Sequence, residues 1–184
     1  MNQENNTTPR FNYTQNAWEG TKYRKNENLF GASLTKAIRQ ELKEKLPNCK
    51  FSVVSETYSG GQSVNIYLMS ANFNPFKPLT DEVLEEIKTN CKRAFGDFWE
   101  RSLEQAIENY KNETTVKFYH QLNQYYIKDD LCLTDKAKEV ITKALGIAQS
   151  YNFDDSDGQI DYFHTNFYLH AGIGKWNKPF TIKQ

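Results

Sequence analysis

The chain has few cysteines, and their spacing is informative. Cys49, Cys91 and Cys132 are its only three cysteines, and none belongs to a CxxC pair. An odd number of widely spaced cysteines fits neither a disulfide framework nor a structural zinc site. We therefore expect a reducing compartment.

Long apolar runs and net charge are also lacking. No stretch approaches the roughly 20 apolar residues that cross a bilayer, and no charged-then-apolar leader opens the chain. The 23 Lys and Arg residues balance 23 Asp and Glu residues, so no global field attracts nucleic acid or membrane. The sequence predicts a soluble protein without a membrane partner, in which any charge that binds a ligand is local.

The length of 184 residues predicts one domain with a proper core. The chain opens with a stretch rich in Asn, Gln and Thr that has almost nothing to bury and cannot offset its ordering entropy. We expect residues 1–28 to be flexible and residues 29–184 to form a single domain.

The folded part begins with signals for a helix and a β-hairpin. Apolar residues recur at helical spacing from Ser33 to Leu46, beside a partly basic face, and Pro47 ends the helix. KFSVVSETY and SVNIYLM then predict two strands joined at Gly60 and Gly61, because glycine tolerates positive φ.

A long helical insertion is expected before the last strand. Thr80, followed by two acidic residues, is typical of a helix N-terminus, and apolar stripes continue over residues 80–149. Within it, the periodicity of residues 114–133 does not distinguish a helix from an extended arm, and we assign a helix. Alternation over residues 162–171 predicts a final strand. The predicted fold is α+β: an antiparallel sheet of about three or more strands, packed on the first helix.

The stretch LTKAIRQELKEKLPNCKFSVVSETYSGGQSVNIYL resembles the start of a large polyvalent protein-associated domain, a small module of bacteriophage and conjugative-element proteins. It has the typical IRxELKxxxP helix, KFSV strand and YSGG turn, and SDGQIDYF resembles the acidic closing segment. Two features depart from the pattern: SANFNPF replaces a Trp-Asp-Gly-Pro-like turn, and residues 80–149 have no counterpart in it. The resemblance implies an accessory role in a mobile element, in the cytoplasm of a bacterial host. It brings no catalytic residue and no cofactor.

An acidic run, DDSDGQID, suggests a calcium loop but does not fit one. With Gly158 as the sixth position of an EF-hand, the first and twelfth positions hold Phe153 and His164, neither of which is the required acid. We interpret the run as a strand-capping acidic turn and predict no bound metal. A metal-dependent hydrolase is a remote alternative, which would be built on the carboxylates of Asp154, Asp155, Asp157 and Asp161 together with the nearby histidines.

Two surfaces and one turn are candidates for contact with nucleic acid. Cations on the first helix and just after it could meet phosphates, although an ordinary solvated helix face shows as many. Polar and aromatic residues on one face of the last strand and the hairpin could stack bases, unless the insertion covers that face. The glycines of the turn are favoured as turn residues, because no Gly-Lys-Ser/Thr follows them. The candidate residues are Lys36, Arg39, Lys43, Lys50, Tyr58, Gly60, Gly61, Tyr67, Tyr162, His164, Tyr168 and His170.

The leading functional hypothesis is a non-enzymatic accessory module of a phage or mobile element that engages nucleic acid or nucleoprotein. The alternative is an anti-defence or regulatory protein that binds a host protein, with Trp99, Tyr110 or the segment QYYIKDDL at the interface. Net neutrality suits the alternative better. No Asp-His-Ser or Cys-His spacing indicates a nucleophile. His120 is isolated within a predicted helix, where a histidine is more often a surface or hydrogen-bonded residue than a general base.

Overall fold

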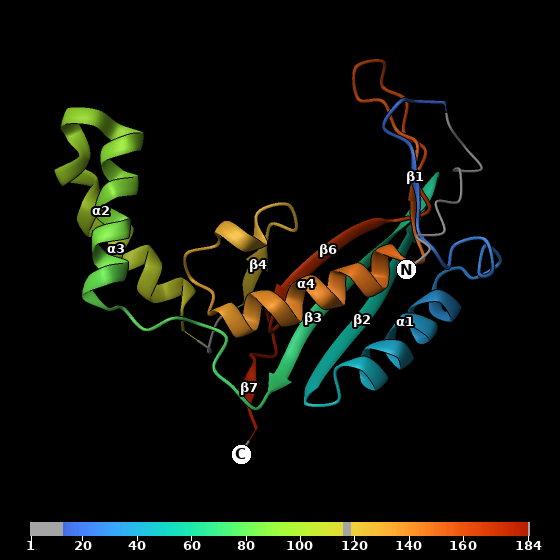
Figure 1. Ribbon diagram of the computed structural model, residues 1–184, viewed down its shortest axis with the longest axis horizontal. Helices are drawn as coiled ribbons and strands as arrows, with labels where there is room; N and C mark the ends of the chain where they lie inside the picture. The colour runs from blue at the N-terminus through green and yellow to red at the C-terminus, as the bar shows by residue number, and fades with distance from the viewer. Residues whose placement is uncertain (1–12, 116–118, 184) are drawn as a thin grey trace, which may run out of the picture.

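The computed structural model describes residues 13–115 and 119–183 (Figure 1). The elements in chain order are β1 (Trp18–Glu19), α1 (Ala32–Lys45), β2 (Cys49–Tyr58), β3 (Gly61–Ala71), α2 (Asp81–Phe95), the short 3-10 helix η1 (Gly96–Phe98), α3 (Trp99–Glu113), β4 (His120–Leu122), the 3-10 helix η2 (Ile127–Asp129), α4 (Asp135–Gln149), β5 (Phe153–Asp154), β6 (Tyr168–Ile173) and β7 (Thr181–Ile182). Within the described part of the chain, none of the helices has the length and apolarity needed to cross a membrane.

The central sheet is mixed, with the strand order β2-β3-β6-β4 and with β7 also paired to β3. β2 and β3 form the predicted antiparallel hairpin, and β4 is antiparallel to β6. β6 runs parallel to β3, so the antiparallel pairing expected for the last strand is wrong. The α+β class and the helical insertion are confirmed. The insertion acts as a long crossover, which is the connection that parallel neighbours require.

α1 and α4 cover one face of this sheet and build the core with it (Figure 1). Leu34 and Ile38 of α1 are fully buried, as is Val64 of β3, and Ala144 of α4 belongs to the same cluster. The helix predicted from Ser33 to Leu46 is confirmed within one residue at each end. We call the sheet face under α1 and α4 the inner face, and the opposite face the outer face.

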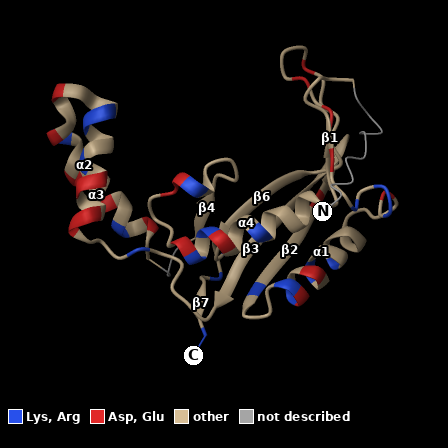
Figure 2. Ribbon diagram, viewed as in Figure 1, with Lys and Arg blue, Asp and Glu red and all other residues tan. Residues whose placement is uncertain are grey.

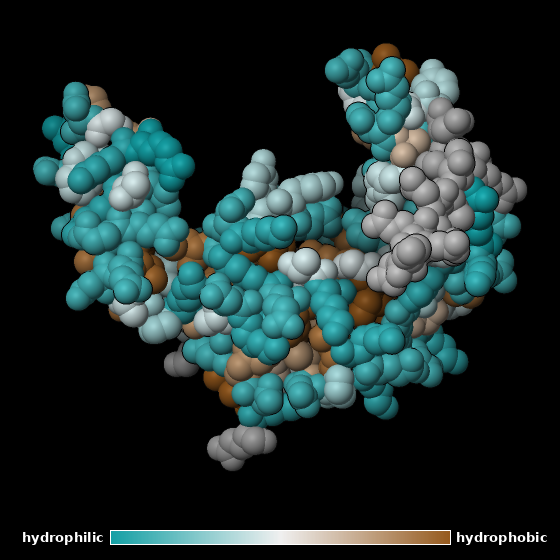
Figure 3. Space-filling view, in the orientation of Figure 1, coloured by the Kyte–Doolittle hydropathy of each residue, from teal (hydrophilic) through white to brown (hydrophobic). Residues whose placement is uncertain are grey.

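α2 and α3 form a helical hairpin, the arm, that stands beside the sheet (Figure 1). The Thr80 hydroxyl accepts a hydrogen bond from the Val83 N–H at 3.3 Å, which confirms the predicted helix start. Gly96 ends α2 with φ of 53°, a conformation that favours glycine, and the chain reverses there. Apolar side chains are visible where the arm joins the body (Figure 3).

The helix predicted over residues 114–133 is wrong where the structure describes that segment. His120–Leu122 forms β4 and Ile127–Asp129 forms η2. His120 and Leu122 are buried while Gln121 is exposed, which is the alternation of a half-buried strand. The pairing with β6, some fifty residues away in sequence, decides the conformation and cannot be read from local periodicity.

The strand predicted over residues 162–171 begins only at Tyr168 and continues to Ile173. Side-chain amides replace ladder bonds just before it. Asn152 donates from Nδ2 to the Phe167 carbonyl and accepts the Phe167 N–H at Oδ1, each at 3.0 Å. Asn166 donates from Nδ2 to the Tyr151 carbonyl at 2.9 Å. Such side-chain bonds compete with a regular ladder, so the alternating sequence forms a loop there.

Residues 13–28 contact the body of the protein, and residues 1–12 lie outside the described residues. β1 pairs with β5, and Tyr23 is buried. The carboxylate of Asp155 accepts the Tyr13 and Thr14 N–H groups at 2.9 and 2.8 Å. The Asn- and Thr-rich composition gave no indication of these contacts.

Candidate nucleic-acid interface

The basic residues predicted on the first helix lie along the free edge of β2. Lys36, Lys43 and Lys50 are exposed, and Figure 2 shows basic residues on α1 and at the start of β2. Arg39 donates from Nη2 to the Val53 carbonyl at 2.7 Å, so part of its guanidinium closes the edge of the sheet. This basic surface therefore offers three exposed lysines, Lys36, Lys43 and Lys50, and one arginine, Arg39, whose guanidinium is partly engaged.

The YSGG segment forms the tight turn of the β2-β3 hairpin, as its glycines predict. Tyr58 pairs with Gly61 across a two-residue loop, and Gly60 has φ of 92°, a conformation that favours glycine. A Cβ on Gly61 would lie 3.3 Å from the ring of Tyr58, so the ring rests on this glycine. Tyr58 still exposes 49% of its surface at the end of the sheet.

Three of the predicted aromatic residues share the outer face with Tyr58. The strand register places Tyr168 beside Ser63 and His170 beside Asn65, and Tyr67 is the next outward residue of β3. Tyr168 is 42% exposed and His170 is also exposed. The arm stands beside the sheet (Figure 1), but Tyr119, from the same insertion, lies over Gly172 and against Tyr67, so the insertion covers part of this face and leaves Tyr168 and His170 exposed.

Two residues that the sequence did not single out complete this cluster. The ring of Tyr119 lies 6.0 Å from that of Tyr67, edge to face, and Lys175 Nζ lies 4.9 Å from the centre of the Tyr67 ring. A Cβ on Gly172 would lie 2.5 Å from the Tyr119 ring, so only glycine fits beneath it. A glycine inside a predicted strand often marks such a close approach, and Gly172 was therefore an available signal.

Tyr162 and His164 do not join this face. They lie on the loop between β5 and β6, where Asp157 and Tyr162 form an isolated bridge. Tyr162 packs on Tyr13 with ring centres 4.6 Å apart, and His164 packs on Phe153 at 4.9 Å. The alternation that suggested one continuous face ends at Tyr168, so these two rings belong to a separate lobe.

The pKa values of two phenols of the outer face are raised. Burial and the Glu56 carboxylate raise the pKa of Tyr67, and burial and Tyr168 raise that of Tyr58. A phenol can donate a hydrogen bond and stack, while positive charge is supplied by Lys175 over Tyr67 and by Lys50 at the start of β2. The arrangement suits a ligand with flat rings and a negative backbone.

The acidic turn serves the fold. Asp155 is 2% exposed and holds the backbone of Tyr13 and Thr14. Burial opposes its ionisation, but these backbone hydrogen bonds outweigh it and lower the pKa of Asp155. Over residues 13–115 and 119–183, no group of three or more His, Cys, Asp or Glu residues could hold a metal ion.

A cavity of about 700 Å³ between the arm and β4 brings Cys132 and His120 together with Asp130. His120 Nε2 lies 3.5 Å from Asp130 Oδ2. Burial, followed by Glu113 and Asp130, raises the pKa of the Cys132 thiol, and its Sγ lies 3.4 Å from Glu113 Oε2. A neutral buried thiol is a poor nucleophile, so this group does not have the properties of a cysteine hydrolase.

Comparison with protein families identifies the class to which this fold belongs. The model of large polyvalent protein associated domain 29 matches residues 31–134, more than half of the chain, and the chain belongs to this family. Family membership suggests an accessory protein of a phage or other mobile element. The match includes the arm, which the motifs recognised in the sequence did not cover, and it ends before SDGQIDYF. Neither a curated protein nor a solved structure matches the chain.

Proposed function

We propose that this protein is a non-enzymatic binding module that engages single-stranded nucleic acid, or a nucleoprotein that displays it, through the outer face. The observation that carries the proposal is the aromatic surface of the outer face, where Tyr58 and Tyr168 are exposed beside the half-buried Tyr67, which Lys175 contacts. Base stacking on aromatic rings contributes about 1–3 kcal/mol per base and tolerates any sequence. Lys36 and Lys43 lie on α1, which covers the inner face beside β2, so a nucleic-acid backbone on the outer face would reach them only around the free edge of β2.

The charge of the surroundings favours the same ligand. Lys36 and Lys43 are exposed on α1, and Lys50 is exposed at the start of β2. Phosphates neutralised by such lysines release counterions, so affinity should fall with salt. The overall neutrality of the chain limits this contribution to a few contacts. We therefore expect a modest salt dependence, and we expect stacking to contribute more of the affinity than charge does.

Fluorescence anisotropy tests the proposal with labelled single- and double-stranded DNA and RNA, at low and physiological salt. We expect single strands to bind at micromolar or tighter concentrations. Tyr168→Ala should weaken binding by about fivefold to a hundredfold, the range that the loss of one stacked base implies. The absence of binding by every nucleic acid at low salt would refute the proposal.

A second pair of variants tests the electrostatic part. Lys36→Glu with Lys43→Glu should weaken binding and flatten its salt dependence. Arg39 is left intact, because its bond to Val53 supports the sheet edge. Arg101→Glu with Lys111→Glu makes the same charge change at exposed positions of α3 and is the matched control. Equal losses in the two double variants would indicate a general charge effect and remove α1 from the interface.

The arm supports a second candidate function, the binding of a host protein. Phe95 and Phe98 are 52% and 65% exposed where α2 meets α3, and Lys92 Nζ lies 4.7 Å from the centre of the Trp99 ring. Exposed aromatic residues are frequent anchors of protein interfaces. Tyr110, which the sequence also suggested, is buried, and its hydroxyl donates to the Lys77 carbonyl.

A nuclease-treated pull-down from host lysate tests this second function. Suppose that the wild type recovers a single stoichiometric partner. Loss of this partner in Phe98→Ser, with its recovery by Tyr168→Ala, would assign protein binding to the arm. Recovery of the same partner by both variants would exclude the arm as its site.

A further inference from the structure

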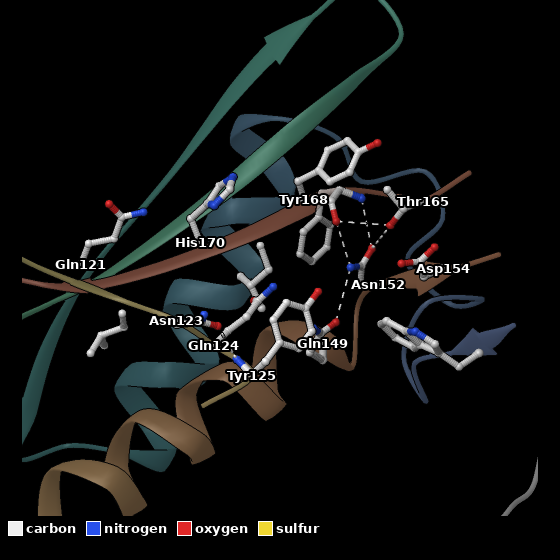
Figure 4. A pocket seen from close by; sticks show the side chains of 14 residues that line it. Gln121, Asn123, Gln124, Tyr125, Gln149, Asn152, Asp154, Thr165, Tyr168 and His170 are labelled. Carbon is white, nitrogen blue, oxygen red and sulfur yellow. Dashed lines mark hydrogen bonds between the residues drawn. The ribbon is translucent and has the colours of Figure 1, made fainter. Parts of the chain in front are cut away.

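A cavity of about 900 Å³ lies beside β6, just beyond the end of β4 (Figure 4). We call it the edge cavity. The lining comes from β6, the loop after β4, the end of α4 and β1, which are distant from one another in sequence. Its size is in the range of pockets that bind small molecules. Of the nucleic-acid-binding residues predicted from the sequence, Tyr168 and His170 line it.

The edge cavity has a backbone donor and acceptor that the sheet ladder leaves open. Successive residues of a strand direct their N–H and C=O groups to opposite sides. The Gly174 N–H binds the Leu68 carbonyl of β3 at 2.9 Å, so by alternation the backbone groups of Leu169 point away from β3. The ladder between β4 and β6 ends at Leu122 and Ala171, before it reaches Leu169.

The next outward position is Phe167, just before the start of β6, and its backbone groups are already bonded. The side chain of Asn152 binds both the N–H and the C=O of Phe167 and so takes the place of a neighbouring strand residue. The open edge is therefore one residue long, with Leu122 on one side and Asn152 on the other. This gap is too short for a strand of another protein but matches a planar group that presents one acceptor beside one donor, such as the edge of a nucleobase.

The side chains around this gap have the chemistry of base recognition. Gln121, Asn123, Gln124 and Gln149 line the cavity, and Figure 4 shows Gln124 and Tyr125 side by side near its centre. The Gln124 Oε1 atom is buried and has no hydrogen-bond partner among the described residues. Among the lining residues that the structure describes, Asp154 is the only Asp, Glu, Lys or Arg, so no lysine or arginine is present to pair with a phosphate, which favours an uncharged ring.

Two aromatic residues and the outer face complete the setting. Trp18 and Tyr125 line the cavity and expose 37% and 81% of their surfaces. Tyr168 and His170 line the cavity and also belong to the outer face, so the two surfaces are continuous. A strand that stacks bases on the outer face can turn one base into the cavity.

We propose that the edge cavity binds one base of a single-stranded nucleic acid. This base leaves the stack of its neighbours, stacks instead on Tyr125 or Trp18, and forms hydrogen bonds with the Leu169 backbone and Gln124 Oε1. This inference rests on the proposed function, because it names a site within the same interface. It adds base selectivity to a surface on which stacking alone would be nearly indifferent to sequence.

Anisotropy titrations of four single-stranded DNA homopolymers test the inference with wild-type protein, Tyr125→Ala, Gln124→Leu and the control Tyr126→Ala. Tyr126 is 62% exposed, adjacent in sequence and outside the cavity lining. We expect the wild type to prefer one base and Tyr125→Ala to lose about fivefold to a hundredfold in affinity. Gln124→Leu should reduce the difference in affinity between the preferred base and the others. Tyr126→Ala should match the wild type.

The outcomes separate this inference from the proposed function. If the wild type binds all homopolymers equally and Tyr125→Ala matches Tyr126→Ala, the cavity holds no base while the outer face still binds. If no homopolymer binds at all, the proposed function fails, and this site with it. Selection of peptides from a random library, dependent on Tyr125 but not on Tyr126, would assign the cavity to a peptide and overturn the inference. Unchanged unfolding midpoints establish that the variants fold.

Discussion

The two faces of the sheet are made by the same strands but have opposite chemistry. On β3, Val64, Ile66 and Leu68 are nearly inaccessible beneath α1 and α4. On the outer face, Tyr67 and its neighbour Tyr168 keep part of their surface in solvent. The stability of the fold comes mainly from one face, so the other is free to carry aromatic and basic residues that packing does not require.

Truncation of a side chain to alanine should cost much more stability on the inner face than on the outer face, and this is the largest effect that we expect. Leu68→Ala on the inner face should lower the free energy of unfolding by about 2–5 kcal/mol, through lost burial and the cavity left behind. Tyr168→Ala on the outer face should change it by less than about 1 kcal/mol, as surface substitutions usually do. Urea denaturation followed by circular dichroism measures both. Similar losses in the two variants would mean that the outer face is covered in solution.

Substitution of Asn152 tests whether its side-chain bonds to Phe167 fix the residue at which β6 begins. Asn152→Ala leaves the N–H and C=O of buried Phe167 without their partners. Leaving a buried polar group unsatisfied costs roughly 1–3 kcal/mol, so we expect a loss of that order in the free energy of unfolding. Asn166→Ala, which removes the bond to the Tyr151 carbonyl, is the companion variant and should cost less. An unchanged midpoint for Asn152→Ala would show that the start of β6 is set by other contacts.

The sequence predicted the inner face better than the outer one, for a physical reason. Helical spacing and alternation report burial, and they place α1 and the β2-β3 hairpin almost to the residue. The outer face depends on contacts between distant segments, such as Tyr119 resting on Gly172. Period-two alternation continues through His164, but side-chain amides end the ladder before that residue is reached. Lys175 follows the strand and had no pattern to single it out.

Asp155 gives a pH-dependent test of the lobe that flanks the sheet. Its pKa is lowered in the folded protein from the ordinary 3.8, so the folded state holds fewer protons than the unfolded state near that pH. The stability that it contributes is present above 3.8 and is lost as the pH falls through the folded value. We expect Asp155→Asn to be less stable at neutral pH and to lose less stability on acidification.

Urea midpoints at about pH 3 and about pH 6 measure this difference. Glu41, whose pKa is also lowered through Lys22 and Tyr151 although burial opposes the shift, should leave some acid sensitivity in the variant. Parallel acid profiles for the wild type and Asp155→Asn would show that the bonds to Tyr13 and Thr14 do not persist in solution.

The smallest effect concerns the cation above the outer face. Lys175 Nζ lies 4.9 Å from the centre of the Tyr67 ring; both residues are partly exposed, and a pair that is not fully desolvated contributes about 0.5–1 kcal/mol. Lys175→Gln should therefore lower the free energy of unfolding by no more than about 1 kcal/mol, while the exposed control Lys178→Gln leaves it unchanged. If the outer face is a binding surface, Lys175→Gln should weaken nucleic-acid binding more than Lys178→Gln does. A larger loss in the free energy of unfolding than in that of binding would show that Lys175 supports the fold rather than a binding surface.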